Sequence, residues 1–293
     1  MNKISPFLLG LSLAVAGSQL AAAQENAPAT PSIPKVLQIT REFTKPGKGG
    51  QAHEKTEYGF IQAMERAKFP AYYLGMTSMS GKGRALFFTQ YDSFETWEKD
   101  NKLFDKNPVL AADFERANVT DGELLDSVDS EVFTYDADLS YRPHGDISDA
   151  RYMEISIFKV KPGHGHEFRE LVKTAIEANK KGGTSAHWAT FEAAYGVEDG
   201  TYNMLSADKS MAEIDTGMAE GKQFEAAMGE EGMKKFHEGV ASAMEWSRSE
   251  LFAFSPHMSY LPETWVKTDP AYWKPKAPAA SAAKAAEKEK PKP

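Results

Sequence analysis

An internal repeat constrains this chain more than any other feature of its sequence. A Lys-Pro-Gly-x-Gly segment at residues 45–49 recurs at residues 161–165, 116 positions later. Two further segments recur 119 positions apart, namely residues 130–133 at 249–252 and residues 139–143 at 258–262. Three matched segments in the same order, with a nearly constant offset, indicate a tandem duplication.

Both copies show the same order of predicted elements. Apolar and polar residues alternate over 36–43 and 152–160, which is typical of a half-buried strand, and the Pro-Gly turn ends each strand. A helix follows, with an apolar stripe that includes Phe168 and Val172 in the second copy. Two strands, a helical region and a closing strand complete each copy. The sequence therefore predicts an α+β fold of two tandem ferredoxin-like β-α-β-β-α-β units.

Composition sets the boundaries of these units. Residues 1–23 resemble a signal peptide, with Lys3, an apolar run over 7–17, and small residues before a cut at Gln24. The run is too short to span a bilayer, although an uncleaved anchor is the alternative. We expect a flexible segment at 24–34, the first unit at 35–143, a linker at 144–150, the second unit at 151–262, and an extended, disordered tail at 263–293.

These features predict a periplasmic or secreted protein without a transmembrane segment in its mature part. The chain has no cysteine, so core packing must hold the fold. Its net charge is −8, to which the tail from Lys274 contributes +4 and Lys3 +1, so the folded part carries −13. Such an acidic body disfavours nucleic acid as a partner. The basic tail is either a tether to anionic envelope polymers or a solvated segment without a partner.

The order of elements and the Pro-Gly turn resemble the dimeric α+β barrel superfamily, which includes NIPSNAP-like proteins and the antibiotic-biosynthesis-monooxygenase group. The resemblance covers residues 35–141 and 151–260. It implies that the two units pair their sheets into a barrel within one chain, as a monomer or a homodimer. The uses of this fold include cofactor-free oxygenation, haem binding or degradation, and isomerisation, and the fold does not choose among them.

In such a barrel one sheet face meets the helices and the other lines an interior that holds a small-molecule ligand. If Leu37, Ile39, Met153 and Ile155 face the helices, the alternate side chains face inward. The predicted pocket residues, taken with their neighbours on the other strands, are Gln38, Thr40, Glu42, Tyr72, Phe133, Glu154, Ser156, Trp188 and Phe252.

Three residues are candidates for catalysis. Glu131 and Glu250 occupy equivalent positions on the closing strands, where burial in an apolar pocket raises the pKa of a carboxyl group and suits it to acid–base work. The alternative is that they are rim residues, solvated or paired with Arg41 or Arg248. His187 replaces Tyr72 of the first copy, and this loss of symmetry makes it a candidate base.

Metal and cofactor signals are weaker. His237 lies on the last helical segment, and a helix-borne histidine can ligate haem iron, although the sequence requires no cofactor. His164 and His166 lack a third ligand, so the sequence predicts no metal site. Three functions remain open: a binding module for a small apolar or aromatic molecule, a cofactor-free oxygenase-like or isomerase-like enzyme, and a haem protein.

Overall fold

The structure is a computed structural model that describes residues 33–274. The predicted signal peptide and the Lys-rich end of the tail lie outside the described residues. None of the described helices is long and apolar enough to cross a membrane. The chain order of the elements is β1 (Val36–Thr44), α1 (Gln51–Ala67), β2 (Tyr73–Ser78), β3 (Arg84–Tyr91), α2 (Phe94–Asp105), α3 (Pro108–Gly122), β4 (Leu125–Tyr141), β5 (Tyr152–Val160), α4 (Gly165–Gly182), β6 (Trp188–Tyr195), β7 (Thr201–Asp208), α5 (Met211–Ala219), α6 (Gly221–Met228), α7 (Glu230–Ala243), β8 (Met244–Phe254), η1 (Pro256–Met258), α8 (Glu263–Val266) and α9 (Pro270–Trp273).

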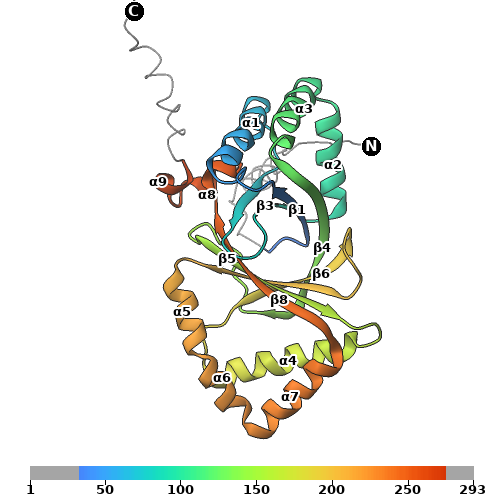
Figure 1. Cartoon of the computed structure of the whole chain (residues 1–293), viewed down its shortest axis with the longest axis vertical. Helices are drawn as coiled ribbons and strands as arrows, with labels where there is room; N and C mark the ends of the chain where they lie inside the picture. Colours follow the sequence, from blue (N-terminus) through green and yellow to red (C-terminus); the bar gives the residue numbers. More distant parts are fainter. Residues whose placement is uncertain (1–32, 275–293) are drawn as a thin grey trace, which may run out of the picture. The chain divides into compact units, whose positions relative to one another are not determined.

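The eight strands form one closed antiparallel barrel in the order β1-β3-β2-β8-β5-β7-β6-β4. Strands β1 to β4 come from the first half of the chain and β5 to β8 from the second, and the halves join where β2 pairs with β8 and β4 with β6. Helices α1 to α3 cover one side of the barrel and α4 to α7 the opposite side (Figure 1). Closure of the barrel gives hydrogen-bond partners to the backbone groups of the edge strands that each half would otherwise expose.

Two local features recur at equivalent positions of the two halves. The turns after β1 and β5 place Gly47 and Gly163 at positive φ values of 76° and 86°, a conformation that glycine adopts without strain. Equivalent hydroxyl pairs join the first strand of each half to its last: Thr40 Oγ1 lies 3.1 Å from Ser130 Oγ, and Ser156 Oγ lies 2.8 Å from Ser249 Oγ.

The faces of the strands are reversed relative to the sequence prediction. Leu37, Ile39, Met153 and Ile155 belong to one core cluster that draws on strands of both halves, so they fill the barrel interior. Phe158, in the opposite phase of β5, instead contacts Phe168 of α4, with ring centroids 5.8 Å apart. Alternation defines two faces, but both faces of this sheet are covered, so the pattern alone does not say which one meets the helices.

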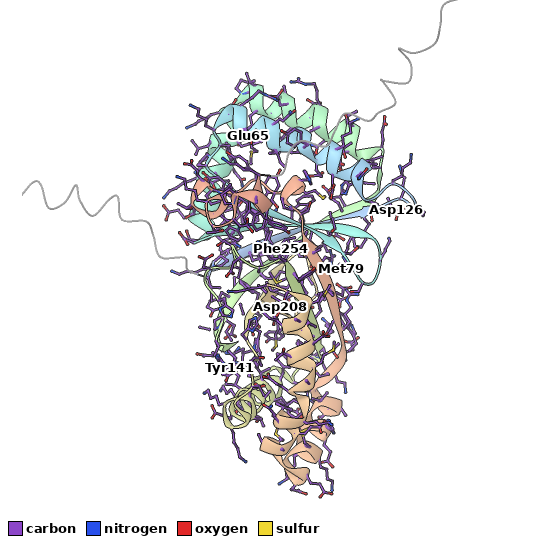
Figure 2. All side chains as sticks on the ribbon, turned by 90° about the vertical axis from the view of Figure 1, so that its left-hand side faces the viewer. Glu65, Met79, Asp126, Tyr141, Asp208 and Phe254 are labelled. Carbon is purple, nitrogen blue, oxygen red and sulfur yellow. The ribbon has the colours of Figure 1, made fainter. Side chains whose placement is uncertain are left out.

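Large apolar side chains of the described residues pack inside the barrel. Phe133 and Phe252, at equivalent positions on β4 and β8, are both fully buried in its core. Phe254 of β8, labelled in Figure 2, belongs to the same core cluster. The two halves enclose a shared interior that holds large apolar side chains, and the described residues also line cavities at its end and under the helices.

Residues 263–273 also differ from the expected extended tail, because they form the short helices α8 and α9. Val266 and Trp273 are buried in the barrel core cluster, and Trp273 Nε1 donates a hydrogen bond of 2.8 Å to the Ser148 carbonyl oxygen. The Ala, Pro and Lys composition that suggested a disordered tail belongs to the residues beyond this point.

Candidate functional site

A cavity of about 260 Å³ lies between the second half's sheet and the helices α4, α6 and α7. We call it the helix cavity. Nearly all of its lining side chains are apolar, and five are aromatic. They are Phe158, Phe168, Leu171, Val172, Ala175, Asn179, Trp188, Met204, Phe224, Phe236, Val240 and Met244.

The spacing of residues on α4 creates this space. Phe168, Val172 and Ile176 follow one another at four-residue intervals and pack on the sheet. Leu171 and Ala175 lie beside this stripe and face the cavity, and the small side chain of Ala175 leaves room there. Gly229, at a φ of 74°, separates α6 from α7 and so allows the two helices to supply Phe224 and Phe236 to the lining.

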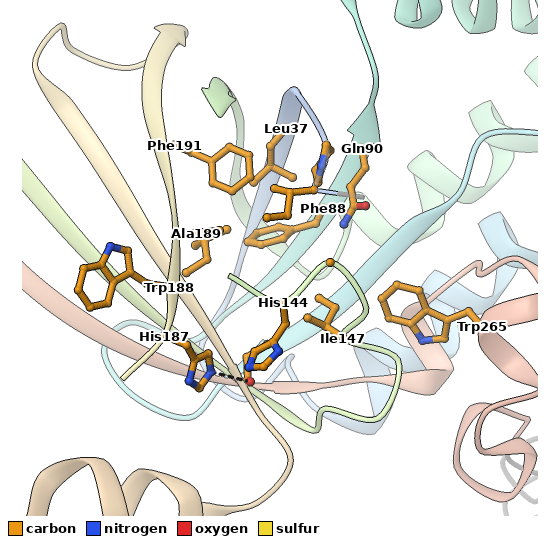
Figure 3. A pocket seen from close by; sticks show the side chains of 15 residues that line it. Leu37, Phe88, Gln90, His144, Ile147, His187, Trp188, Ala189, Phe191 and Trp265 are labelled. Atoms are coloured by element: carbon orange, nitrogen blue, oxygen red, sulfur yellow. Dashed lines mark hydrogen bonds between the residues drawn. The ribbon is translucent and has the colours of Figure 1, made fainter. Parts of the chain in front are cut away.

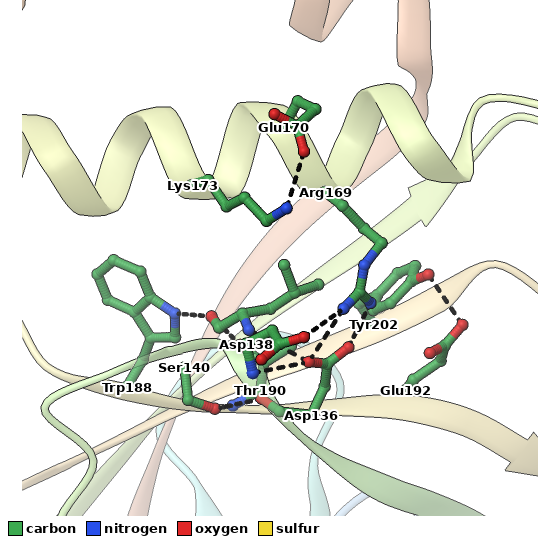
Figure 4. Close-up of polar contacts among 11 residues, drawn as sticks. Asp136, Asp138, Ser140, Arg169, Glu170, Lys173, Trp188, Thr190, Glu192 and Tyr202 are labelled. Atoms are coloured by element: carbon green, nitrogen blue, oxygen red, sulfur yellow. Dashed lines mark hydrogen bonds and ion pairs between the residues drawn. The ribbon is translucent and has the colours of Figure 1, made fainter.

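Trp188 is held firmly at the sheet side of the cavity. Its Nε1 donates a hydrogen bond of 2.8 Å to the Leu139 carbonyl oxygen, which also accepts one of 2.7 Å from Thr190 Oγ1 (Figure 4). The sequence predicted Trp188 in a pocket inside the barrel, whereas here it lines the helix cavity on the helix side of the sheet. A fixed indole ring offers a ligand a rigid stacking surface at little cost in conformational entropy.

The described lining of the helix cavity contains no titratable side chain. Its one polar residue, Asn179, is already engaged, because its Nδ2 donates to the Ala175 carbonyl oxygen and its Oδ1 accepts from Thr184 Oγ1. His237 is exposed on α7 and is not among the lining residues. The donor set of the cavity therefore does not fit haem iron, and its geometry supplies apolar contact without proton transfer.

A second pocket lies at one end of the barrel, where the linker between the halves crosses the start of β6 (Figure 3). Its apolar part is a cavity of about 60 Å³ that reaches the core residues Leu37, Phe88 and Phe191. A polar pocket of about 660 Å³ adjoins it, and both are lined by His144 and His187, whose ring centroids lie 4.6 Å apart. We call this region the barrel mouth.

His187, the candidate base, is positioned by backbone carbonyls. Its Nε2 lies 3.1 Å from the Ala207 carbonyl oxygen and its Nδ1 lies 3.3 Å from that of Ser185. Because a carbonyl oxygen only accepts, each contact requires a protonated ring nitrogen, and a neutral ring can donate to only one of the two.

Buried acids lie close to this histidine. Asp208 is 3% exposed, and its Oδ2 has no hydrogen-bond partner among the described residues. Burial raises the pKa of Asp208, against the opposing effect of His187, and burial likewise raises the pKa of Glu154. Burial and the neighbouring His187 lower the pKa of His144. Titratable groups with shifted pKa values often gather at functional sites.

Glu131 and Glu250 lie inside the barrel, and both are paired with arginines. Glu131 Oε1 is 2.8 Å from Arg41 Nη1, while Glu250 pairs with Arg84 and lies 3.6 Å from Arg248 Nε. Their side chains are only 10% and 11% exposed, so they are not solvated rim residues. The paired state that the sequence allowed as an alternative is the one found, although Arg84 was not foreseen.

The comparisons with known proteins address the fold. No protein-family model matches the chain, and no curated protein does either. Among solved structures, a monooxygenase-like protein from Fusobacterium nucleatum subsp. nucleatum ATCC 25586 aligns with 10% identity and a TM-score of 0.50, over 77% of this chain and 94% of its own.

The chain has the dimeric α+β barrel fold.

Two further α+β barrel structures align less closely. An anthrone oxidase-like protein aligns with 14% identity and a TM-score of 0.49, over 75% of this chain and 92% of its own. A chlorite dismutase variant from Candidatus Nitrospira defluvii aligns with 7% identity and a TM-score of 0.45, over 81% and 96%. At these identities the likeness concerns the fold alone.

The other predicted pocket residues of this α+β barrel are dispersed. Thr40 and Ser156 join strands through their hydroxyl pairs, while Gln38 and Glu42 lie with them in the opposite phase from the barrel core. Tyr72 stacks on Tyr260 and borders a cavity of about 180 Å³ under the first half's helices. Of these other predicted pocket residues, only Glu154 lies near His187.

The sequence reasoning also missed residues that shape both sites. His144 lies in a segment read only as a linker, and Asp208 lies two residues beyond the predicted end of its strand. The cavity residues of α6 and α7 carried a signal, since Phe224 and Phe236 belong to an apolar and Met-rich helical stretch. That pattern is equally typical of ordinary core packing.

Proposed function

We propose that this protein binds a small apolar or aromatic molecule in the helix cavity and does not transform it. The observation that carries the proposal is a cavity of about 260 Å³ with an almost wholly apolar described lining. Apolar cavities of about 150 Å³ already bind benzene, so this one suits a molecule of one or two rings.

The expected affinity follows from the area that such a ligand buries. A two-ring aromatic molecule loses on the order of 200 Å² of apolar surface, which at about 25 cal/mol/Å² gives roughly 5 kcal/mol. This corresponds to a dissociation constant on the order of 0.1 to 1 mM. Polar substituents that reach the cavity opening would tighten a natural ligand beyond this value.

The test is a titration of the purified protein with naphthalene, followed by tryptophan fluorescence and calorimetry. Ala175→Leu fills the cavity with a residue of high helix propensity and is expected to abolish binding. Ala71→Leu, which fills the first half's cavity, serves as the matched control and is expected to bind as the wild type does. Equal naphthalene affinity in the wild type and Ala175→Leu would exclude the helix cavity as the site.

A second candidate is an enzyme that uses His187 as a base at the barrel mouth. The specific observation in its favour is that His187 and Asp208 line one polar pocket of about 660 Å³, and that the buried Oδ2 of Asp208 has no hydrogen-bond partner among the described residues. A base there would accept a proton from an acidic O–H or C–H group of a substrate. The reaction class is cofactor-free oxygenation or isomerisation.

Oxygen consumption distinguishes the enzyme from the binding module. Hydroquinone incubated with the wild type is expected to consume oxygen faster than the buffer does, and His187→Ala is expected to remove the difference. Unchanged consumption in His187→Ala would remove His187 from the role of base. Ala175→Leu, which alters only the helix cavity, should leave this rate unaffected.

We also propose that the barrel consists of two tandem ferredoxin-like units that arose by duplication. The strand order β4-β1-β3-β2 of the first half corresponds to β8-β5-β7-β6 of the second, which supports the proposal. Each half alone would leave one edge of two strands without a partner, and the pairs β2 with β8 and β4 with β6 cover these edges. Residues 35–141 expressed alone are accordingly expected to dimerise, as size-exclusion chromatography with light scattering would show.

The binding function is proposed to operate outside the cytoplasm. The support is the sequence of residues 1–23, with Lys3, the apolar run and the small residues before Gln24. Expression in a Gram-negative host, followed by fractionation and intact-mass measurement, tests this. A periplasmic product that begins at Gln24 is expected, and a full-length product in the cytoplasm would contradict the proposal.

A further inference from the structure

Four potential ligand side chains converge between β1 and the helices α1 and α3, which cover the first half's sheet (Figure 1). They are Glu42 of β1, His53 and Glu57 of α1, and Asp121 of α3. One nitrogen or oxygen atom from each lies within 4.8 Å of all the others. His53 Nε2 is 3.0 Å from Glu42 Oε2, 3.3 Å from Asp121 Oδ1 and 3.7 Å from Glu57 Oε1. We call these four residues the acidic cluster.

The acidic cluster is removed from solvent, and one of its oxygens has no partner. His53, Glu57 and Asp121 are each no more than 3% exposed. Oε1 of Glu57 points toward His53 and accepts no hydrogen bond within the described part of the chain. A buried carboxylate oxygen that lacks a donor is costly, so it calls for a partner other than the described side chains.

The charges of the cluster are also unbalanced. It holds three carboxyl groups, and among the described residues only His53 is a basic side chain within 4.0 Å of any of them. Three carboxyl groups around one imidazole form a donor set that favours a bound cation.

The second half shows that the fold does not need these residues. Glu42 pairs with Ala85 and Val128, and Phe158 occupies the same place in the second half's sheet, paired with Tyr202 and Ser247. The buried faces of α1 and α4 place His53 and Glu57 at the positions of Phe168 and Val172, and the repeat offset of 119 places Asp121 at that of Val240. The second half therefore builds an apolar cavity where the first half places three acids and a histidine.

We propose that Glu42, His53, Glu57 and Asp121 form a binding site for one first-row divalent cation such as Zn²⁺ or Mn²⁺. Two ligands that share a tetrahedral Zn²⁺ lie about 3.4 Å apart, which matches the spacing of the cluster atoms. Carboxylates with one imidazole suit these ions, whereas Ca²⁺ and Mg²⁺ prefer oxygen ligands alone. The cation joins β1 to both covering helices and satisfies the free oxygen of Glu57.

Metal content of the purified full-length protein tests the proposal. The protein is stripped with EDTA, dialysed against Zn²⁺ or Mn²⁺, and analysed by mass spectrometry for metals. One equivalent per chain is expected, with a rise in Tm of about 5 °C at saturating metal. Glu57→Gln and Asp121→Asn keep the side-chain shapes and are expected to weaken binding by about tenfold or more.

Two controls separate this site from other ligands in the chain. Glu131→Gln removes a buried carboxylate elsewhere and is expected to keep the bound equivalent. The double variant His164→Ala with His166→Ala removes the one His-Gly-His turn and is also expected to keep it. Retention in Glu57→Gln together with loss in the His164 and His166 variant would overturn the proposal.

Cobalt provides a readout that does not depend on a variant. Co²⁺ bound by the wild-type cluster in four or five coordination is expected to give visible absorption stronger than that of the aqueous ion. The circular-dichroism spectrum shows whether the stripped protein remains folded during the titration. If the wild-type protein is folded and the Co²⁺ spectrum remains that of the aqueous ion, the site is excluded.

Discussion

Arg84 of β3 and Glu250 of β8 form an ion pair inside the barrel, although 166 residues separate them in the chain. The two strands belong to different halves, so the pair links the halves through side chains as well as through the β2 and β8 backbones. The Arg84 guanidinium also lies over the Phe252 ring, with its carbon 4.9 Å from the ring centroid. Because the pair is buried, removing one partner leaves the other charge without compensation and lowers the stability of the fold.

Glu250→Gln is expected to destabilise the protein by about 3 to 5 kcal/mol, because it leaves Arg84 buried without its counter-charge. Adding Arg84→Met to this variant should recover much of the loss, since the double variant contains no unpaired buried charge. Urea denaturation monitored by circular dichroism measures both values. A double variant as unstable as Glu250→Gln alone would show that the ion pair is not the cause.

Gly75 of β2 is expected to tolerate no side chain. A Cβ atom there would lie 2.1 Å from the Met258 carbonyl oxygen, where the chain after β8 passes against β2. Gly75→Ala should therefore destabilise by about 1 to 3 kcal/mol or more, through displacement of η1. The control is Gly59→Ala in α1, whose Cβ would meet Ala117 at an ordinary 3.5 Å and should stabilise the helix by about 0.5 to 1 kcal/mol. Thermal unfolding of both variants checks the contrast.

The repeat in the sequence was sufficient to predict the order of the elements. Residues 84–91 and 152–160 form strands with the predicted bounds, because alternation and Pro-Gly turns are local signals. The prediction of one barrel within the chain is confirmed by the strand order. The phase of Leu37 and Ile39 was wrong, since a local pattern does not record which of two covered faces meets the helices.

The sites were harder to predict because their members come from distant segments. Trp188 was recognised through the contrast between the halves, and the helix cavity does include it. The acidic cluster was not, since Glu42 and Asp121 are far apart in sequence and only the packing of α1 against α3 and β1 brings them together. Trp265 and Trp273 make the chain after residue 262 more apolar than is typical of a disordered tail. The prediction of a disordered tail from residue 263 did not take them into account.

Trp273 fixes the end of the described chain to the barrel. It is 5% exposed, its Nε1 bonds to Ser148, and the Arg151 guanidinium carbon lies 5.9 Å from its ring centroid. Trp273→Ala is expected to cost about 3 to 5 kcal/mol and to expose the barrel core to solvent. Limited proteolysis followed by mass spectrometry should then show cleavage near residues 262–270 that the wild type resists. Unchanged protease resistance would contradict a role for Trp273 in holding α8 and α9.

Glu131 gives the protein a specific pH dependence. Burial raises the pKa of Glu131 above its ordinary value of 4.5, and the opposing attraction of Arg41 only partly offsets this. A raised pKa means that the folded state holds the proton more tightly than the unfolded state does. The stabilising effect of the protonated carboxyl group is therefore complete below pH 4.5 and is lost as the pH rises through the pKa of the folded protein.

Comparison with Glu131→Gln isolates this effect, because glutamine has nearly the same shape and does not titrate. The free energy of unfolding of the wild type minus that of Glu131→Gln is expected to be larger at pH 4 than at pH 7. Urea denaturation at half-unit intervals of pH measures the difference, and effects of the other acids cancel when the two proteins are subtracted. A difference that grows between pH 4 and pH 7 would mean that Arg41 outweighs burial and lowers the pKa of Glu131. That result would make the barrel interior more polar than its packed aromatic core indicates.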